Sequence, residues 1–243
     1  MSKKIGCVIA YKNNHTNYGT SLVGYALIKK LQQLGNDVEV INYVKHPTFK
    51  EKVVIGINQI RVTGFFNFLK KRFAPKPTNL NYINGIKIRT KAVEAYKERK
   101  LIPLFRDYVG FNALQKGSKN YDAIVVGSDQ VWLPLGLKTK FFNLLFVDDN
   151  VRKIAYASSF GVSEIPLFQK KDTATYLDRF YRISVREQKG KEIVDSLSKK
   201  KAEVVADPTM LLDRSEWAEE ITSSQVDTSV PYVFCYFLGN NPE

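Results

Sequence analysis

The 243-residue sequence is poor in cysteine and histidine, with two of each. Cys7 and Cys235 lie near opposite ends of the chain, which excludes a disulfide framework and a cysteine-based zinc site. We therefore expect a reducing, cytoplasmic setting and no metal site. His15 and His46 both fall in polar loop contexts and are expected at the surface.

Long apolar runs are also lacking. The longest stretch without Lys, Arg, Asp or Glu covers 16 residues, from Asn13 to Ile28, and it opens with polar side chains. A membrane-spanning helix needs about 20 apolar residues. The apolar run from Ile5 to Ala10 is too short for the core of a signal peptide. The sequence therefore predicts a soluble protein that is not exported by this route.

Acidic residues are scarce in the first half of the chain. Residues 1–120 hold 22 basic and 6 acidic side chains, whereas residues 121–243 hold 15 and 18. Most of the excess lies between Lys45 and Lys119, where 17 basic residues face 4 acidic ones. Such a surface attracts nucleic acid, an anionic membrane or anionic small molecules, or is simply a solvated helical surface. Nucleic acid is the weakest alternative and is not expected, because no DNA- or RNA-binding motif is present.

The stretch from Phe49 to Phe73 is partly amphipathic. Its apolar residues are Val53, Ile57, Ile60, Phe65, Phe68 and Leu69, set among Lys50, Lys52, Arg61, Lys70, Lys71 and Arg72. A basic amphipathic helix either lies on anionic lipid headgroups or covers one face of a sheet, and the second is the more common arrangement. Peripheral contact with an anionic membrane is kept as an alternative.

The order of elements indicates a parallel sheet. Residues 4–10 form a short apolar run typical of a buried strand, a helix follows from Thr20 to Leu34, and residues 37–43 form the next strand. This order marks a βαβ unit. Further strands are predicted at 123–127, 153–157, 182–185 and 203–206, with helices at 167–180 and 189–197 and a capping box from Asp213 to Glu216. We predict an α/β fold with a Rossmann-like parallel sheet flanked by helices.

The expected domain organisation follows from composition. Residues 1–220 form a Rossmann-like domain that includes a basic helical segment at 45–119. A Ser- and Thr-rich linker is predicted at 221–231. Residues 232–243 begin with an apolar strand and then end, which is the pattern of the first strand of a second domain that this chain lacks.

Polar residues follow five of the predicted strands. In open parallel sheets, ligands bind beyond the carboxyl ends of the strands, so residues at these ends are candidates for a site. The candidate binding residues are Asn17, Gly19, Thr20, Gly127, Ser128, Asp129, Gln130, Ser158, Ser159, Gly161 and Arg186.

Structural roles compete with binding at several of these positions. Asn17 and Gly19 fit a tight turn and helix cap as well as a phosphate cradle. Asp129 fits a helix cap, and Trp132 fits a core position. The G-x-G-x-x-G and G-x-S-x-G patterns are absent, so neither a dinucleotide site nor a serine nucleophile at Ser158 or Ser159 is predicted.

Arg186 is the most informative residue in the sequence. It directly follows an apolar strand, where a guanidinium needs an anionic partner. That partner is either a ligand or an internal ion pair with Asp207. Glu187 is expected on the opposite face if the strand continues.

Five blocks, at residues 17–27, 121–132, 154–161, 183–187 and 207–212, resemble the polysaccharide pyruvyl transferase family. They occur in the family's order and cover the chain from end to end. The resemblance implies a GT-B-like architecture of two Rossmann-like domains, of which this chain is the N-terminal half. It also implies transfer of the pyruvyl group of phosphoenolpyruvate to a sugar of a cell-surface polysaccharide, with formation of a ketal and release of phosphate.

The resemblance implies roles for particular residues. Arg186 would hold the anionic groups of phosphoenolpyruvate, and the turn at Asn17–Thr20 and the loops at Gly127–Gln130 and Ser158–Gly161 would line the cleft. The acceptor would be a glycan or a lipid-linked sugar, and no cofactor is implied. The general acid would be a histidine of the second domain without a counterpart here, so no catalytic residue is assigned. Val23 replaces a glutamine found in many relatives.

Two alternatives come from other classes of function. A GT-B glycosyltransferase that uses a nucleotide sugar would share the same sheet edge. A non-catalytic basic binding module at a membrane surface would explain the charge excess.

Overall fold

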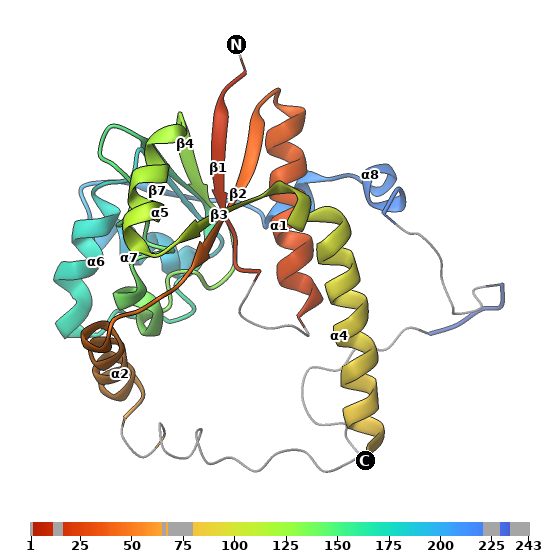
Figure 1. The fold of residues 1–243 in the computed structure, drawn as a ribbon, viewed down its shortest axis with the longest axis horizontal. Helices are drawn as coiled ribbons and strands as arrows, with labels where there is room; N and C mark the ends of the chain where they lie inside the picture. Colours follow the sequence, from red (N-terminus) through yellow and green to blue (C-terminus); the bar gives the residue numbers. More distant parts are fainter. Residues whose placement is uncertain (1, 12–16, 65–66, 68–79, 221–228, 234–243) are drawn as a thin grey trace. The chain divides into compact units, whose positions relative to one another are not determined.

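The computed structural model describes residues 2–11, 17–64, 67, 80–220 and 229–233 (Figure 1). The chain divides into two compact units, Met1–Leu211 and Leu212–Glu243. The described part of the second unit contains α8 (Arg214–Ala218), which begins at the predicted capping box of Asp213 and Glu216. Most of the predicted linker at 221–231 and of the strand predicted after it lies outside the described residues.

The first unit contains a seven-stranded sheet in which all pairings are parallel. Its strands are β1 (Lys4–Val8), β2 (Asp37–Val44), β3 (Phe105–Val109), β4 (Ala123–Val126), β5 (Arg152–Ser158), β6 (Arg182–Val185) and β7 (Ala202–Val204). The spatial order is β3-β2-β1-β4-β5-β6-β7, so the order reverses between β1 and β4. This confirms the predicted Rossmann-like α/β class. β3 was not predicted and lies within the basic segment.

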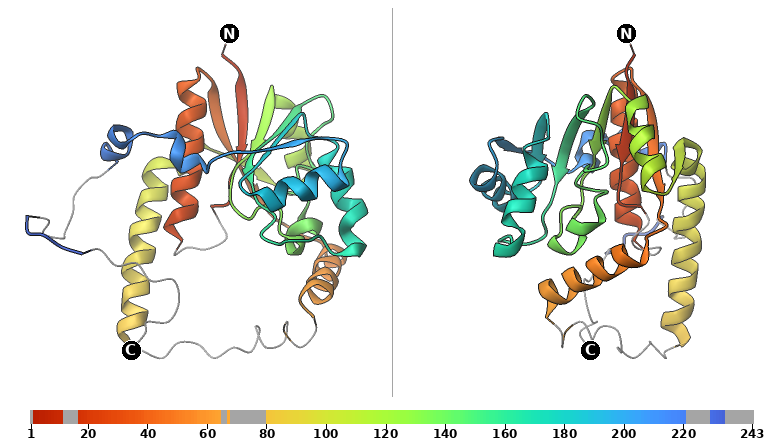
Figure 2. Two further views of the ribbon diagram at one scale, coloured as in Figure 1. Left: turned by 180° about the vertical axis from the view of Figure 1, so that it is seen from behind. Right: turned by 60° about the vertical axis from the view of Figure 1, so that its left-hand side comes forward.

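Helices cover both faces of the sheet (Figures 1 and 2). The helices of the first unit include α1 (Tyr18–Gln33), α2 (Phe49–Thr63), α4 (Leu80–Lys100), α5 (Phe111–Gly117), α6 (Lys170–Leu177) and α7 (Gln188–Leu197), and α2 is not one of those that cover a face. Successive residues of β1 alternate between two hydrophobic clusters, because side chains along a strand point to opposite faces. One cluster includes residues of α1, and the other includes residues of α5, α6 and α7.

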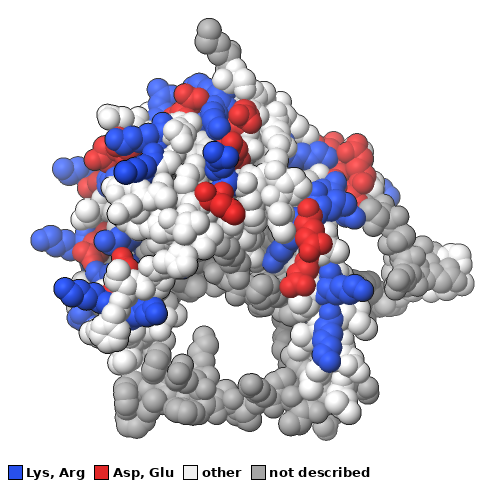
Figure 3. Space-filling view, viewed as in Figure 1, with Lys and Arg blue, Asp and Glu red and all other residues white. Residues whose placement is uncertain are grey.

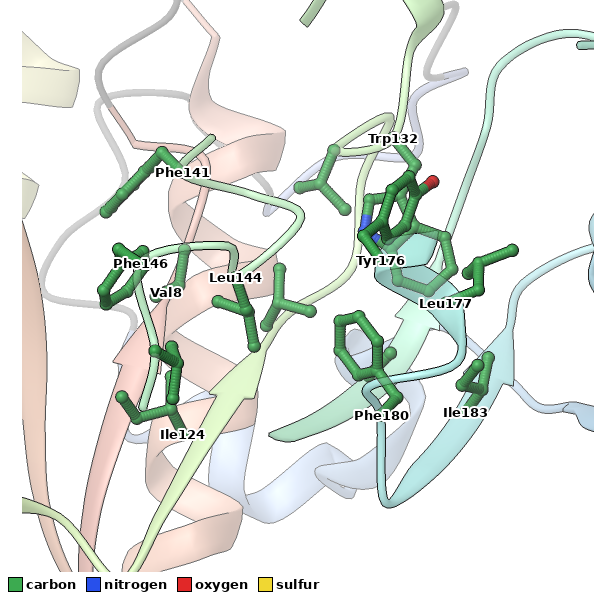
Figure 4. Close-up of a cluster of buried hydrophobic side chains, with 14 of the residues drawn as sticks. Val8, Ile124, Trp132, Phe141, Leu144, Phe146, Tyr176, Leu177, Phe180 and Ile183 are labelled. Atoms are coloured by element: carbon green, nitrogen blue, oxygen red, sulfur yellow. The ribbon is translucent and has the colours of Figure 1, made fainter. Parts of the chain in front are cut away.

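The segment after β4 enters the core on the second face. Trp132 is 4% exposed, which confirms the predicted core position, and its ring lies near those of Tyr176 and Phe180 (Figure 4). The chain continues through the short 3-10 helix η3 (Pro134–Thr139) to Leu144 and Phe146, which are fully buried. The loop at the carboxyl end of β4 is therefore anchored in the core a few residues later.

α2 packs mainly against η3, and not against a face of the sheet as the favoured interpretation of its amphipathic pattern predicted. A polar contact fixes it there. Asn58 is 4% exposed, and its amide donates to the carbonyls of Pro134 and Leu135 at 3.2 and 3.3 Å. Its Oδ1 accepts from Gln169 Nε2 at 2.7 Å. The helix thus sits on a loop, with much of its surface left outside the core.

In the described part of the chain, no helix combines the length and the apolar character that crossing a bilayer requires.

Candidate functional site

The site begins where the strand order reverses. Asn17 caps α1, with its Oδ1 accepting from Thr20 N at 3.3 Å, and Gly19 lies in the first turn. The hydroxyl of Thr20 donates to Asp129 Oδ2, also at 3.3 Å. This bond joins the helix that follows β1 to the loop that follows β4. In doubly wound sheets, that position lies beside the crevice where ligands bind.

The loop after β4 is a tight turn. Asp129 has a φ of 96°, in the left-handed region, and its Oδ1 accepts from Gln130 N at 2.8 Å. Its carbonyl accepts from Ser159 N at 3.0 Å. The expectation that Asp129 caps a helix is wrong, because the chain turns here and then places Trp132 in the core. Packing favours glycine at position 127, since a Cβ there would lie 2.8 Å from Leu27 Cδ2 and the Leu27 side chain would have to shift.

The two serines after β5 have different environments. Ser158 is fully buried, and its hydroxyl donates to the carbonyl of Gly127 at 3.4 Å. Ser159 donates its hydroxyl to Glu187 Oε1 at 2.6 Å and accepts from Gly161 N at 3.1 Å. Ser158 therefore supports the loop from within, whereas Ser159 connects it to the end of β6.

Gly161 offers a test of this loop. Its φ is 62°, and a Cβ there would lie 2.9 Å from Leu133 Cδ2 and 3.0 Å from Gln130 Cδ. We expect Gly161→Ala to lower the free energy of unfolding by about 1–3 kcal/mol, measured by urea denaturation. Gly136→Ala is the matched control, because a Cβ at Gly136 meets nothing within 4 Å. Equal stability of the two variants would show that the turn is not constrained.

Arg186 is paired within the chain. Its Nη1 donates to Asp207 Oδ2 at 3.1 Å, and Ser128 Oγ donates to the same oxygen at 3.1 Å. The other oxygen of Asp207 accepts from the amide and the hydroxyl of Thr209 at 3.0 and 2.8 Å. The Arg186 side chain is 34% exposed. Since this bond uses one of five guanidinium N–H groups, the internal ion pair leaves the capacity to bind an anion as well.

The ionisation of Asp207 reflects these contacts. Burial raises the pKa of its carboxyl, but the hydrogen bonds that it accepts outweigh burial and hold the pKa below its usual value. The stabilisation is therefore complete above the unfolded pKa of about 3.9 and is lost as the pH falls through the lower folded value.

We expect Asp207→Asn to remove part of the stability difference between pH 6 and pH 3, measured as urea midpoints of both proteins at each pH. Asp172→Asn is the control, because Asp172 lies on the exposed surface with Lys138. An unchanged pH dependence in Asp207→Asn would contradict the role of the network.

Glu187 was not among the predicted site residues. It was expected to face away from Arg186 only if the strand continued, and that condition is not met, because β6 ends at Val185 and Glu187 becomes the residue before α7. Its Oε2 lies 4.0 Å from Arg186 Nε. Asp207 and Thr209 were likewise omitted from the candidates, although both follow β7 at the same sheet edge. Their place after a strand was the available signal.

Hydrogen bonds connect the candidate residues in two groups. Thr20, Asp129 and Ser159 link the ends of β1, β4 and β5, and Ser128 and Arg186 meet at Asp207. Gln130 is exposed. His46 is exposed as predicted, and His15 lies outside the described residues. Within the described ranges, no group of His, Cys, Asp and Glu could hold a metal ion.

The sequence matches a protein-family model. The model described as polysaccharide pyruvyl transferase matches residues 17–239, nearly the whole chain. No curated protein and no solved structure matches the sequence.

Proposed function

The chain belongs to the polysaccharide pyruvyl transferase family, and from this premise we propose that phosphoenolpyruvate is its pyruvyl donor. The acceptor is a sugar of a glycan or of a lipid-linked precursor, and the reaction takes place in the cytoplasm. The product is a ketal, and inorganic phosphate leaves. We further propose that this chain supplies one Rossmann-like half of a GT-B-like architecture.

The observation that carries the proposal is the position of Arg186. Phosphoenolpyruvate presents a carboxylate and a phosphate, and a guanidinium binds either group through paired hydrogen bonds. Arg186 is held at the carboxyl edge by Asp207 and remains 34% exposed. Asp207 orients it, and Ser128 fixes Asp207 in turn. A charged group that is held in place before the ligand arrives loses little freedom on binding.

The reaction balances without a cofactor. Two sugar oxygens form bonds to the central carbon of the donor, and the bond from that carbon to the phosphate oxygen breaks. The two sugar hydroxyls release two protons in total. One is balanced by the proton that the methylene carbon gains when it becomes a methyl group, and the other by the proton that the departing phosphate gains. Proton transfer to carbon requires a general acid. We assign binding and orientation of the donor to the residues described above. We do not assign to them the transfer of a proton to carbon.

The proposal is tested by calorimetric titration of the chain with phosphoenolpyruvate, followed by assays of phosphate release with a panel of glycan acceptors. We expect saturable binding of phosphoenolpyruvate and, with the correct acceptor, one phosphate per pyruvylated product detected by mass spectrometry. Binding of nucleotide sugars without binding of phosphoenolpyruvate would overturn the proposal in favour of glycosyl transfer.

A further inference from the structure

α2 has an apolar face that points away from the protein. Phe49, Val53 and Ile57 lie four residues apart, which places them on one side of a helix. Their exposed fractions are 81%, 43% and 53%. We call these three residues the outer stripe. The opposite side of the helix contains Asn58, which is buried against η3. Since the inner contact fixes the rotation of α2, the outer stripe is directed outward.

Basic side chains border the outer stripe. Lys52 lies along one side of it, and Lys50 and Arg61 lie along the other, as helical spacing requires. α2 also contains the acidic residue Glu51. Its carboxylate accepts hydrogen bonds from the backbone N–H and the side-chain hydroxyl of Thr48. Figure 3 shows uncharged surface next to Lys and Arg side chains in this region. The exposed face of α2 is therefore apolar and cationic at once.

A pocket of about 240 Å³ continues this cationic surface at the start of α2. Its lining includes Lys45, Lys50, Lys138 and Lys140. The ammonium of Lys140 lies over the ring of Phe111, and that of Lys45 over the ring of Tyr43. Lys138 also pairs with Asp172. The lysines of this lining outnumber its one acidic residue, Glu51, so the pocket adds positive charge beside the outer stripe.

We propose that α2 docks on an anionic lipid bilayer, with the outer stripe in the interfacial layer and the bordering lysines on headgroup phosphates. Helices that bind in this way combine an exposed apolar face with flanking basic residues, and both are present here. The charge complementarity favours an anionic bilayer over a second copy of this chain, because two copies would bring like charges together.

Docking through α2 has a consequence for the candidate site. In Figures 1 and 2, α2 lies beyond the carboxyl edge of the sheet, the edge that carries Arg186 and Asp129. A bilayer bound to α2 would therefore lie on the same side of the sheet as the site. This favours an acceptor that is presented at a membrane surface, but the docking itself does not depend on pyruvyl transfer.

The experiment is sedimentation of the purified chain with vesicles of phosphatidylcholine alone or mixed with phosphatidylglycerol. We expect binding to the anionic vesicles, weakened by salt, and at least about tenfold weaker binding to the neutral ones. Phe49→Ser combined with Ile57→Ser should weaken anionic binding by about tenfold without loss of helical circular dichroism, since both residues are exposed. Lys50→Gln combined with Lys52→Gln should weaken binding and reduce its salt dependence.

Ile88→Ser is the matched control. Ile88 is 73% exposed and lies on α4, another basic helix, so it is outside the outer stripe of α2. It should bind as the unaltered chain does. The proposal is overturned if anionic vesicles do not bind, or if the stripe variant and the control bind equally. It is also overturned if the unaltered chain is a dimer that the stripe variant converts to a monomer, because the stripe would then be an interface between copies.

Discussion

Arg186→Ala is expected to weaken binding of phosphoenolpyruvate by at least about 100-fold, which in a calorimetric titration means no measurable heat. The guanidinium makes charge-assisted hydrogen bonds to the donor in our proposal, and each contributes about 1.5–3 kcal/mol. Two such bonds correspond to a loss of about 100-fold or more. The rest of the site, including Ser128 and Asp129, would remain in place.

The substitution also leaves Asp207 without its cationic partner, so folding must be measured separately. Asp207 keeps the hydrogen bonds from Ser128 and Thr209, and we expect the thermal midpoint to fall only modestly. Arg186→Lys is the informative second variant, because it retains the charge but not the planar geometry, and it should bind at an intermediate level. Arg152→Ala is the control, since Arg152 is exposed at the opposite end of β5 and lies over Tyr181. Full binding by Arg186→Ala would place the donor elsewhere.

Much of the fold could be predicted because six strands carry their own signal. β1 and β4 are short, apolar and contain β-branched residues, as strands buried on both faces do, and β5 has a short apolar stretch from Ile154 to Ala157. The N-cap at Asn17 and the capping box at Asp213 mark helix starts in the sequence alone. These local preferences agree with the global fold, which is why a single sequence was sufficient.

β3 carries no such signal. Among the strands that the structure describes, it pairs only with β2, at the edge of the sheet, and within β3 only Tyr108 is buried. Charged residues such as Arg106 and Asp107 are tolerated at an exposed edge, where they also discourage pairing with other chains. The strand therefore resembles the basic helical region around it. Its existence depends on the register with β2, which is a long-range property.

In the candidate site, too, some features could be predicted from local sequence and others depend on contacts between distant residues. That Arg186 and Asp129 share one sheet edge followed from parallel strands, but their partners did not. β6 ends at Val185, as predicted, and Glu187 then lies at the start of α7, where its carboxylate accepts from the hydroxyl of Ser159. That contact depends on how the chain turns after the strand, which the strand pattern does not specify. Asp207 was foreseen as a partner of Arg186, yet Ser128 on the same oxygen was not, because β4 and β7 are distant in sequence.

Trp132→Ala is expected to lower the free energy of unfolding by about 3–5 kcal/mol. Trp132 is 4% exposed, its ring centroid lies 5.1 to 5.8 Å from those of Phe160, Tyr176 and Phe180, and its Nε1 donates to the carbonyl of Phe142 at 3.2 Å. Removal of the ring leaves a cavity and an unpaired carbonyl. Trp132→Phe keeps most of the packing and should cost less. Trp217→Ala is the control, because Trp217 is half-buried in the short helix α8.

The same variant tests how the site is held. Trp132 follows Asp129 and Gln130 by two or three residues, and its backbone amide donates to the carbonyl of Ser159 at 3.1 Å. The buried ring thus fixes the turn that faces Thr20. We expect Trp132→Ala, titrated at low temperature where it is still folded, to bind phosphoenolpyruvate more weakly than Trp132→Phe. If the two variants bind alike while differing in stability, the turn is held by its own hydrogen bonds, and the core supports the fold but not the site.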